Sequence, residues 1–220
     1  MRTDQEIRCD VERELEWEPS LDERRVGVSA VDGVITLTGE VDSFGEKWNA
    51  ERAVERVAGV RGIANEITIR SSSSHTDSDI AQAAVAALKS NVLVPSDDIQ
   101  VQLVNGWLTL TGTVSWDYQR RAAESSVRNI RGVKGVSNLI TVRPKVEPQG
   151  IKEKIEETFR RQAVYDARRV TVEVNGREVT LRGTVRSWAE RHEAEKAAWA
   201  APGVAEVHNY ITVEPVPAVA

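Results

Sequence analysis

Hydrophobic and polar residues alternate in one ten-residue pattern that occurs three times along the chain. The first copy, Asp32–Val41, reads Asp-Gly-Val-Ile-Thr-Leu-Thr-Gly-Glu-Val, and the second spans residues 105–114. The third copy, residues 175–185, is read with one residue inserted after its Asn-Gly. Asp-Gly and Asn-Gly favour positive φ angles and open tight turns, and the alternating Thr-Leu-Thr favours a strand. Each copy therefore predicts a β-hairpin.

Glycines mark the same two places in every hairpin. One lies in the turn and the other lies near the end of the second strand, where glycine indicates a bulge or a close approach of another backbone. We assign both sets a structural role: Gly33, Gly106 and Gly176 in the turns, and Gly39, Gly112 and Gly183 in the strands.

The glycines of the second strands are separated by 73 and then by 71 residues. The same two separations relate Asn65 to Asn138 and Asn209, so the repeat extends well beyond the hairpin. Self-similarity at a fixed period indicates repeated structural units. The sequence predicts three tandem domains, at residues 1–70, 77–143 and 150–214.

Two helices flank the hairpin in each repeat. The first is predicted from apolar residues at every fourth position and begins at a capping-box pattern, Thr3–Glu6 or Thr76–Asp79. The second has a buried face rich in alanine, and similar patterns open it at Ser43–Glu46 and Ser187–Glu190. A glycine is expected to cap its C-terminus. The apolar stripes of the first helices are Ile7, Val11 and Leu15, then Ile80, Ala84 and Leu88, then Ile151, Ile155 and Phe159.

A last strand follows the second helix, so the order of elements in each repeat is α-β-β-α-β. A hairpin followed by a helical crossover places the second and third strands parallel in one sheet. The predicted fold class is α+β: three tandem αββαβ domains, each a mixed three-stranded sheet with two helices on one face.

In this order and in its motifs, the repeat resembles the BON domain (bacterial OsmY and nodulation domain). The resemblance depends on the Asp/Asn-Gly turn, the Leu-Thr-Gly-x-Val segment, and an ending that reads Asn-x-Ile-Thr-Val or Ile at 65–69, 138–142 and 209–213. It implies an αββαβ fold, as read above from the residues. It also implies a link to osmotic and envelope stress, with phospholipid surfaces as ligands of some members and small ions for members joined to a LysM module. This chain departs from those members, since it shows neither an export signal nor a LysM-like segment.

Composition narrows the cellular setting. The chain is 40% hydrophobic and 29% charged, with a net charge of −5, so it has no overall attraction to nucleic acids or anionic membranes. The residues after Met1 form a charged helical pattern rather than a signal peptide, and no run of apolar residues is long enough to span a membrane. We therefore expect a cytoplasmic protein, peripheral at the membrane if it binds lipid; the resemblance to BON domains implies a bacterial one. Cys9 is the only cysteine, so no intrachain disulfide forms.

Residues suited to catalysis are scarce. His75, His192 and His208 have no cysteine or carboxylate neighbours at metal-ligand spacing, and no phosphate-binding loop or nucleophile elbow is present. We therefore expect no enzyme activity, no cofactor and no metal. Gly-Val-Arg-Gly at 59–62 and Gly-Val-Lys-Gly at 132–135 match the GXXG loop of KH domains, but that loop joins two helices there, and the third repeat departs from it. A nucleic-acid ligand is therefore not expected.

Charge differs among the repeats. Residues 1–70 hold 10 basic and 16 acidic residues, whereas residues 71–145 hold 8 basic and 6 acidic residues. The second helix of repeat 2 and its exit concentrate the basic residues, and two aromatic residues stand at its start. Such a surface suits anionic lipid headgroups or an acidic partner; the alternatives are a solvated helix face or a face that docks repeat 1. The predicted contact residues are Arg120, Arg121, Arg128, Arg131, Lys134, Trp116 and Tyr118.

Six tryptophans are many for a chain with two phenylalanines. They indicate either packing between repeats or an exposed interface. The main hypothesis is a non-enzymatic, OsmY-like protein of the osmotic stress response that contacts anionic phospholipid or membrane surfaces. The alternative hypothesis is a protein-interaction scaffold of packed BON repeats that has no lipid ligand.

Overall fold

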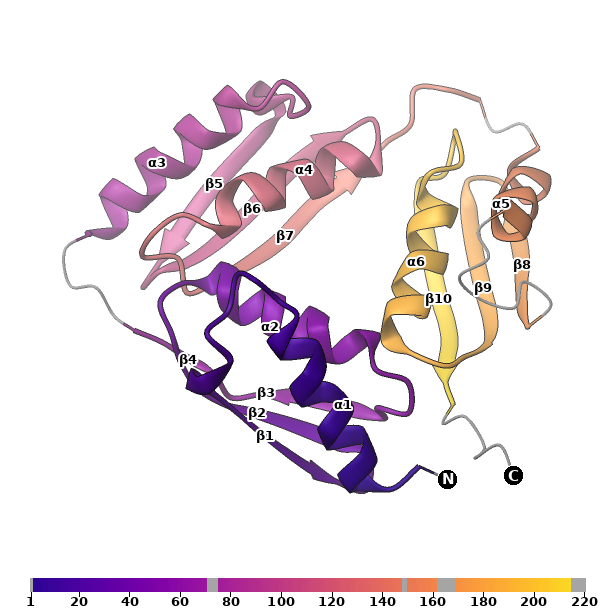
Figure 1. Ribbon diagram of the computed structural model, residues 1–220. Coiled ribbons are helices and arrows are strands. Elements are labelled where there is room, and N and C mark those ends of the chain that lie inside the picture. Colours follow the sequence, from indigo (N-terminus) through magenta and orange to yellow (C-terminus); the bar gives the residue numbers. More distant parts are fainter. Residues whose placement is uncertain (1, 71–74, 148–149, 162–168, 215–220) are drawn as a thin grey trace. The chain divides into compact units, whose positions relative to one another are not determined.

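The computed structural model describes residues 2–70, 75–147, 150–161 and 169–214 (Figure 1). The elements follow the order α-β-β-α-β in each repeat. Repeat 1 contains α1 (Asp4–Glu16), β1 (Val26–Val31), β2 (Val34–Val41), α2 (Phe44–Arg56), β3 (Gly62–Asn65) and β4 (Thr68–Ile69). Repeat 2 contains α3 (Asp77–Ser90), β5 (Ile99–Val104), β6 (Trp107–Val114), α4 (Asp117–Arg128) and β7 (Gly135–Val142). Repeat 3 contains α5 (Ile151–Arg161), β8 (Val170–Asn175), β9 (Glu178–Val185), α6 (Trp188–Trp199) and β10 (Glu206–Val213).

Each repeat forms its own sheet around the second strand of the hairpin. That strand is antiparallel to the first strand and parallel to the third, as β6 is to β5 and β7. Both helices of a repeat cover one face of its sheet (Figure 1). The predicted α+β fold is therefore confirmed. In repeat 1 the third strand is divided into β3 and β4, both of which pair with β2.

The chain divides into two compact units, one built mainly from repeats 1 and 3 and the other from repeat 2. Inside the first unit, Trp188 Nε1 donates to the carbonyl oxygen of Val60 at 3.1 Å, so this tryptophan takes part in packing between repeats. His192 Nδ1 lies 3.2 Å from the Glu55 carboxylate. Burial raises the pKa of Glu55, but the hydrogen bond and charge of His192, together with Arg52, bring that pKa below its ordinary value.

The first helices start as predicted. Thr3 and Thr76 cap α1 and α3, and the carboxylates of Glu6 and Asp79 accept hydrogen bonds from the backbone N–H groups of those threonines. These bonds lower the pKa of both carboxyl groups. At α6 the box is altered, because Glu190 accepts from the N–H of Arg186.

The glycines after α4 and α6 are not helix caps, which corrects the expectation for these two helices. Asn129 caps α4 and Ala200 caps α6, whereas Gly132 and Gly203 lie further on with φ angles of 91° and 95°. The valine after each glycine is buried, and the next N–H donates to the carbonyl oxygen of the hairpin turn, as Lys134 does to Gly106 at 2.8 Å. These contacts give the residues of the GXXG-like loops a structural role in the fold.

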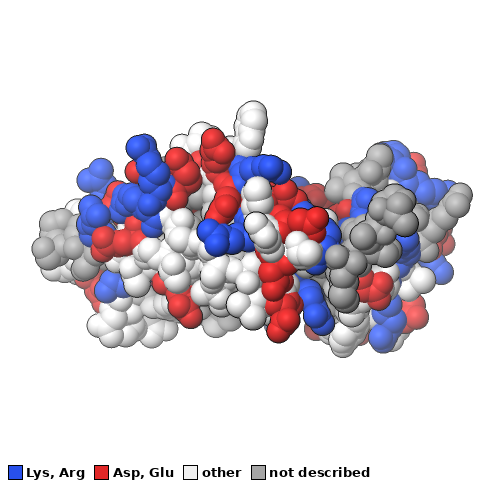
Figure 2. Space-filling model, turned by 60° about the horizontal axis from the view of Figure 1, so that its bottom comes forward, with Lys and Arg blue, Asp and Glu red and all other residues white. Residues whose placement is uncertain are grey.

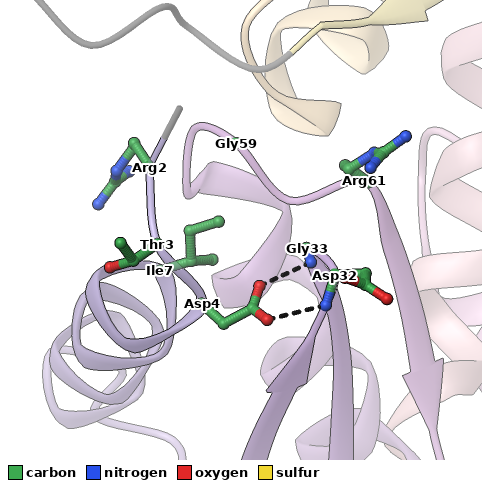
Figure 3. Close-up of a pocket in the computed structure, with 8 residues that line it drawn as sticks. All are labelled: Arg2, Thr3, Asp4, Ile7, Asp32, Gly33, Gly59 and Arg61. Carbon is green, nitrogen blue, oxygen red and sulfur yellow. Dashed lines mark hydrogen bonds between the residues drawn. The ribbon is translucent and has the colours of Figure 1, made fainter.

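Aspartates at the start of the first helices hold the hairpin turns of repeats 1 and 2. The two carboxylate oxygens of Asp4 accept from the N–H groups of Asp32 and Gly33, each at 2.8 Å (Figure 3). Asp77 accepts from the corresponding groups of the second turn at 2.7 and 3.1 Å. These bonds tie the first helix to the sheet, and they satisfy turn donors that the strand ladder leaves unpaired.

The third turn is built differently, and the expected insertion after Gly176 is wrong. Asn175 belongs to β8 and pairs with Glu178, so the turn has two central residues, as in the other repeats. Asp32 and Gly33 both have positive φ, which a type I′ turn requires. In the third turn only Gly176 does, as in a type II′ turn. The residue matched to Asp77 is Pro148, which lies outside the described residues and has no carboxylate.

The strand glycines mark a close backbone approach, one of the two roles predicted for them. A Cβ atom on Gly112 would lie 2.1 Å from the carbonyl oxygen of Asp98, and its φ is 137°. Gly39 and Gly183 show the same contact, at 2.0 and 1.9 Å. The second strand runs on through each glycine instead of ending there.

Replacing Gly112 by alanine is expected to destabilise repeat 2 by about 2 kcal/mol or more, because the backbone conformation is strained for alanine and the neighbouring carbonyl blocks the methyl group. Hydrogen exchange followed by mass spectrometry should show lost protection across β5 and β6. Gly62→Ala is the control, since its nearest neighbours lie 3.6 Å or more from the added Cβ. Equal protection in the two variants would contradict the close-approach role.

The capping box of α3 predicts a pH effect. Because the pKa of Asp79 is lowered on folding, its ionised form stabilises the helix above the unfolded pKa, and this stabilisation is lost as the pH falls through the folded pKa. Thr76→Val removes the hydroxyl donor and is expected to raise the pKa of Asp79, as measured by NMR titration of its carboxyl carbon. Ser78→Ala changes a residue that lies within the box but takes no part in its hydrogen bonds, and should leave that pKa unchanged.

Candidate functional site

The predicted contact residues of repeat 2 surround α4 but occupy both of its ends. Trp116 and Tyr118 stand at the start of the helix, with ring centroids 6.4 Å apart. Arg131 and Lys134 follow the helix, in the loop before β7. A helix of 12 residues is about 18 Å long, so these cations lie far from the aromatic pair. The structure therefore does not bring the predicted residues into one patch.

Three of the five predicted cations already contact carboxylates. Arg120 and Arg121 both pair with Asp117, the latter at 2.7 Å, and Asp117 is buried. Arg128 pairs with Glu124 at 3.2 Å. The net positive field of α4 is thus weaker than its arginine count indicates. On the molecular face in Figure 2, basic and acidic side chains are likewise interspersed.

Repeat 2 has a hairpin end and an opposite end with different side chains. At the hairpin end, the aliphatic part of Lys134 packs against Gly106. A Cβ atom added to Gly106 would lie 3.1 Å from the Lys134 side chain. The opposite end, here called the loop end, comprises Val92, Leu93, Trp116, Tyr118 and Arg121. The start of β5 pairs with the end of β6, so the loop after α3 and the start of α4 lie at the same end of the sheet.

Sequence reasoning missed the outward face of α3. Val92 and Leu93, just beyond that helix, are 99% and 56% exposed. Along the helix, three exposed positions are apolar, whereas the matched positions of α1 and α5 are all charged. The three sets are Ala83, Val85 and Ala86 in α3, Asp10, Glu12 and Arg13 in α1, and Lys154, Glu156 and Glu157 in α5. A position-by-position comparison of the first helices, like that made for the second helices, would have found this difference.

Repeat 1 contains a cavity of about 280 Å³ beside its hairpin turn (Figure 3). Arg2, Asp4, Asp32 and Arg61 contribute charges of both signs to its lining. Arg2 already donates to the carbonyl oxygen of Ala58 and pairs with Asp10, and the Asp4 carboxylate is occupied by the turn. Two of the four charged side chains of this cavity, Arg2 and Asp4, therefore hold the turn, the helix and the loop together.

The histidines do not form a reactive site in the part of the chain that the structure describes. His192 contacts Glu55, and His208 lies 3.5 Å from Glu206. No group of three or more His, Cys, Asp or Glu side chains that could hold a metal ion occurs among the described residues. In the same residues, no helix is long and apolar enough to cross a lipid bilayer.

Comparison with known proteins gives the family. The model of the BON domain matches residues 3–71, 76–144 and 149–215, so nearly the whole chain is covered. The chain belongs to the BON domain family and carries three copies of the domain.

One curated relative is the Osmotically-inducible protein Y of Escherichia coli (strain K12), which is 28% identical over 119 residues. The match covers 51% of this chain and 59% of that protein, so the chain spans little more than half of the length of its relative. Among solved structures, CdsD, a structural protein of the type III secretion system of Chlamydia trachomatis, is 14% identical over 94% of this chain, with a TM-score of 0.28. Its C-terminal domain gives 14% identity and a TM-score of 0.26.

Proposed function

We propose that this protein is a non-enzymatic binding protein of the osmotic stress response that attaches to anionic phospholipid surfaces through the loop end of repeat 2. The supporting observation is the exposure of Val92 and Leu93, together with the exposed apolar residues Ala83, Val85 and Ala86 of α3. The stress role is proposed from the family and from the name of the Escherichia coli relative.

The chemistry of the loop end suits the interface of a bilayer. Val92 and Leu93 expose aliphatic groups, and burial of one such side chain contributes about 1.5–3 kcal/mol. Tyr118, which is 46% exposed, offers an apolar ring with a polar tip. Arg121 keeps donors beyond its bond to Asp117, because a guanidinium carries five N–H groups. A cation near an anionic membrane surface adds about 1 kcal/mol.

A comparison of the described first helices supports placing the contact in repeat 2. The matched helix positions in α1 and α5 carry charges, and burying them against lipid tails would be costly. Of the predicted contact residues, the proposal keeps Trp116, Tyr118 and Arg121 at the loop end, and it does not use Arg120, which pairs with the buried Asp117. Arg128, Arg131 and Lys134 lie toward the other end of α4 and are not part of it.

Val92→Ser/Leu93→Ser should reduce binding to vesicles that contain phosphatidylglycerol by about tenfold or more, because two exposed aliphatic side chains are lost. Co-sedimentation over a lipid titration measures this. Val31→Ser in repeat 1 removes a 66% exposed valine away from the site and is the control. Arg121→Glu should also weaken binding, and added salt should weaken the wild type.

Unchanged binding in the double variant would overturn the assignment to the loop end. If wild-type protein ignores vesicles and light scattering shows a stable multimer, the protein-interaction scaffold replaces the lipid proposal.

A further inference from the structure

The outward face of the sheet of repeat 2 carries no charged residue. Leu108, Leu110 and Val114 of β6 point toward the helices and are buried, so the alternate positions face outward. Within the described strands β5, β6 and β7, those outward positions hold only Gln, Val, Trp, Thr, Gly, Ser and Leu. The same face of repeat 3 carries charges, among them Glu173 and Arg182, which lie 3.9 Å apart.

Trp107 lies flat on this face. It stands opposite Gly135 in the parallel pairing of β6 with β7. Three atoms of its six-membered ring come within 2.4–2.7 Å of the position a Cβ would take on Gly135, so the ring rests on the glycine backbone. Its Nε1 donates to the Ser137 hydroxyl at 2.8 Å, and the side chain is 53% exposed. One face of the indole is thus packed and the other is open.

This arrangement is specific to repeat 2. At the matched position, repeat 1 has Val34 opposite Gly62, and repeat 3 has Glu178 opposite Glu206. A tryptophan can lie flat here only if the facing residue of the third strand is glycine, because any larger side chain would collide with the ring. Of the three repeats, only repeat 2 has both the tryptophan and the facing glycine.

The strand register places the neighbours of the indole in two rows. Val104 and Gly135 stand on either side of Trp107, and Gln102 and Ser137 stand on either side of Thr109. The rows are two residues apart along β6, which is about 7 Å. An open aromatic face therefore lies beside a row of amide and hydroxyl groups that donate and accept hydrogen bonds.

We propose that this face, formed by Trp107 and the row Gln102–Thr109–Ser137, binds a neutral carbohydrate chain. The electron-rich face of an indole attracts the weakly positive C–H groups on the flat side of a sugar ring. The neighbouring row then meets the hydroxyl groups of the same or the next sugar. The absence of charge on the outward face fits a neutral ligand, whereas phosphate groups or nucleic acid require cations there. Its threonine, serine and glutamine side chains oppose insertion into lipid.

The inference goes beyond the proposed lipid contact and uses different residues. Isothermal titration calorimetry of the full chain with two soluble hexasaccharides, of β-1,4-linked glucose and of β-1,4-linked N-acetylglucosamine, tests it. We expect at least one to bind, Trp107→Ala to weaken that binding about tenfold or more, and Trp107→Phe to retain part of it. Gly135→Ala keeps the tryptophan but displaces its ring, and should also weaken binding.

Trp17→Ala, which removes an 82% exposed tryptophan outside this face, is the control. Absence of binding to both sugars, or unchanged binding in Trp107→Ala, overturns the proposal. So does a wild-type dimer that Trp107→Ala converts to a monomer, since the face would then be an interface between copies. Vesicle binding by Trp107→Ala should equal that of wild type, which separates this outcome from the lipid proposal.

Discussion

The bond between an aspartate at the start of the first helix and the backbone of the hairpin turn organises repeats 1 and 2. A helix that contacts a small sheet only through a narrow apolar stripe could slide along it, but Asp4 and Asp77 fix its first turn to one point. The turn carbonyl in the same place accepts the N–H of Arg61 or Lys134, so the loop after the second helix is fixed as well. Three segments far apart in the sequence therefore meet at the turn.

The architecture was predictable because it is encoded in local patterns that repeat. The spacing of Ile7, Val11 and Leu15, and the capping residues Thr3 and Thr76, depend on neighbours a few positions away. The third turn is harder to predict, because Asn175-Gly176 resembles the other turns in sequence. Its register depends on strand pairing, which places Asn175 in β8 instead.

The candidate site was predicted less well, since charge counting ignores where partners lie. Arg120 and Arg121 lie three and four residues after Asp117, the spacing at which helical side chains pair. Part of the neutralisation of these arginines could therefore be predicted from the sequence. The exposure of Val92 could not be predicted from the sequence, because an apolar residue in a short connection can be either buried or exposed. The flat setting of Trp107 depends on Gly135, 28 residues further on, through the pairing of β6 with β7.

The two ways of building the turn restrict how the repeats can exchange parts. A type I′ turn held by an aspartate needs two segments, the turn itself and the aspartate of the first helix, about 28 residues apart. Neither segment forms the hydrogen bonds without the other. A hairpin moved from repeat 1 into repeat 3 would leave turn donors without their carboxylate, whereas repeats 1 and 2 already share both pieces. Recombination within such a gene would therefore favour exchange between the first two repeats and leave the third to diverge on its own.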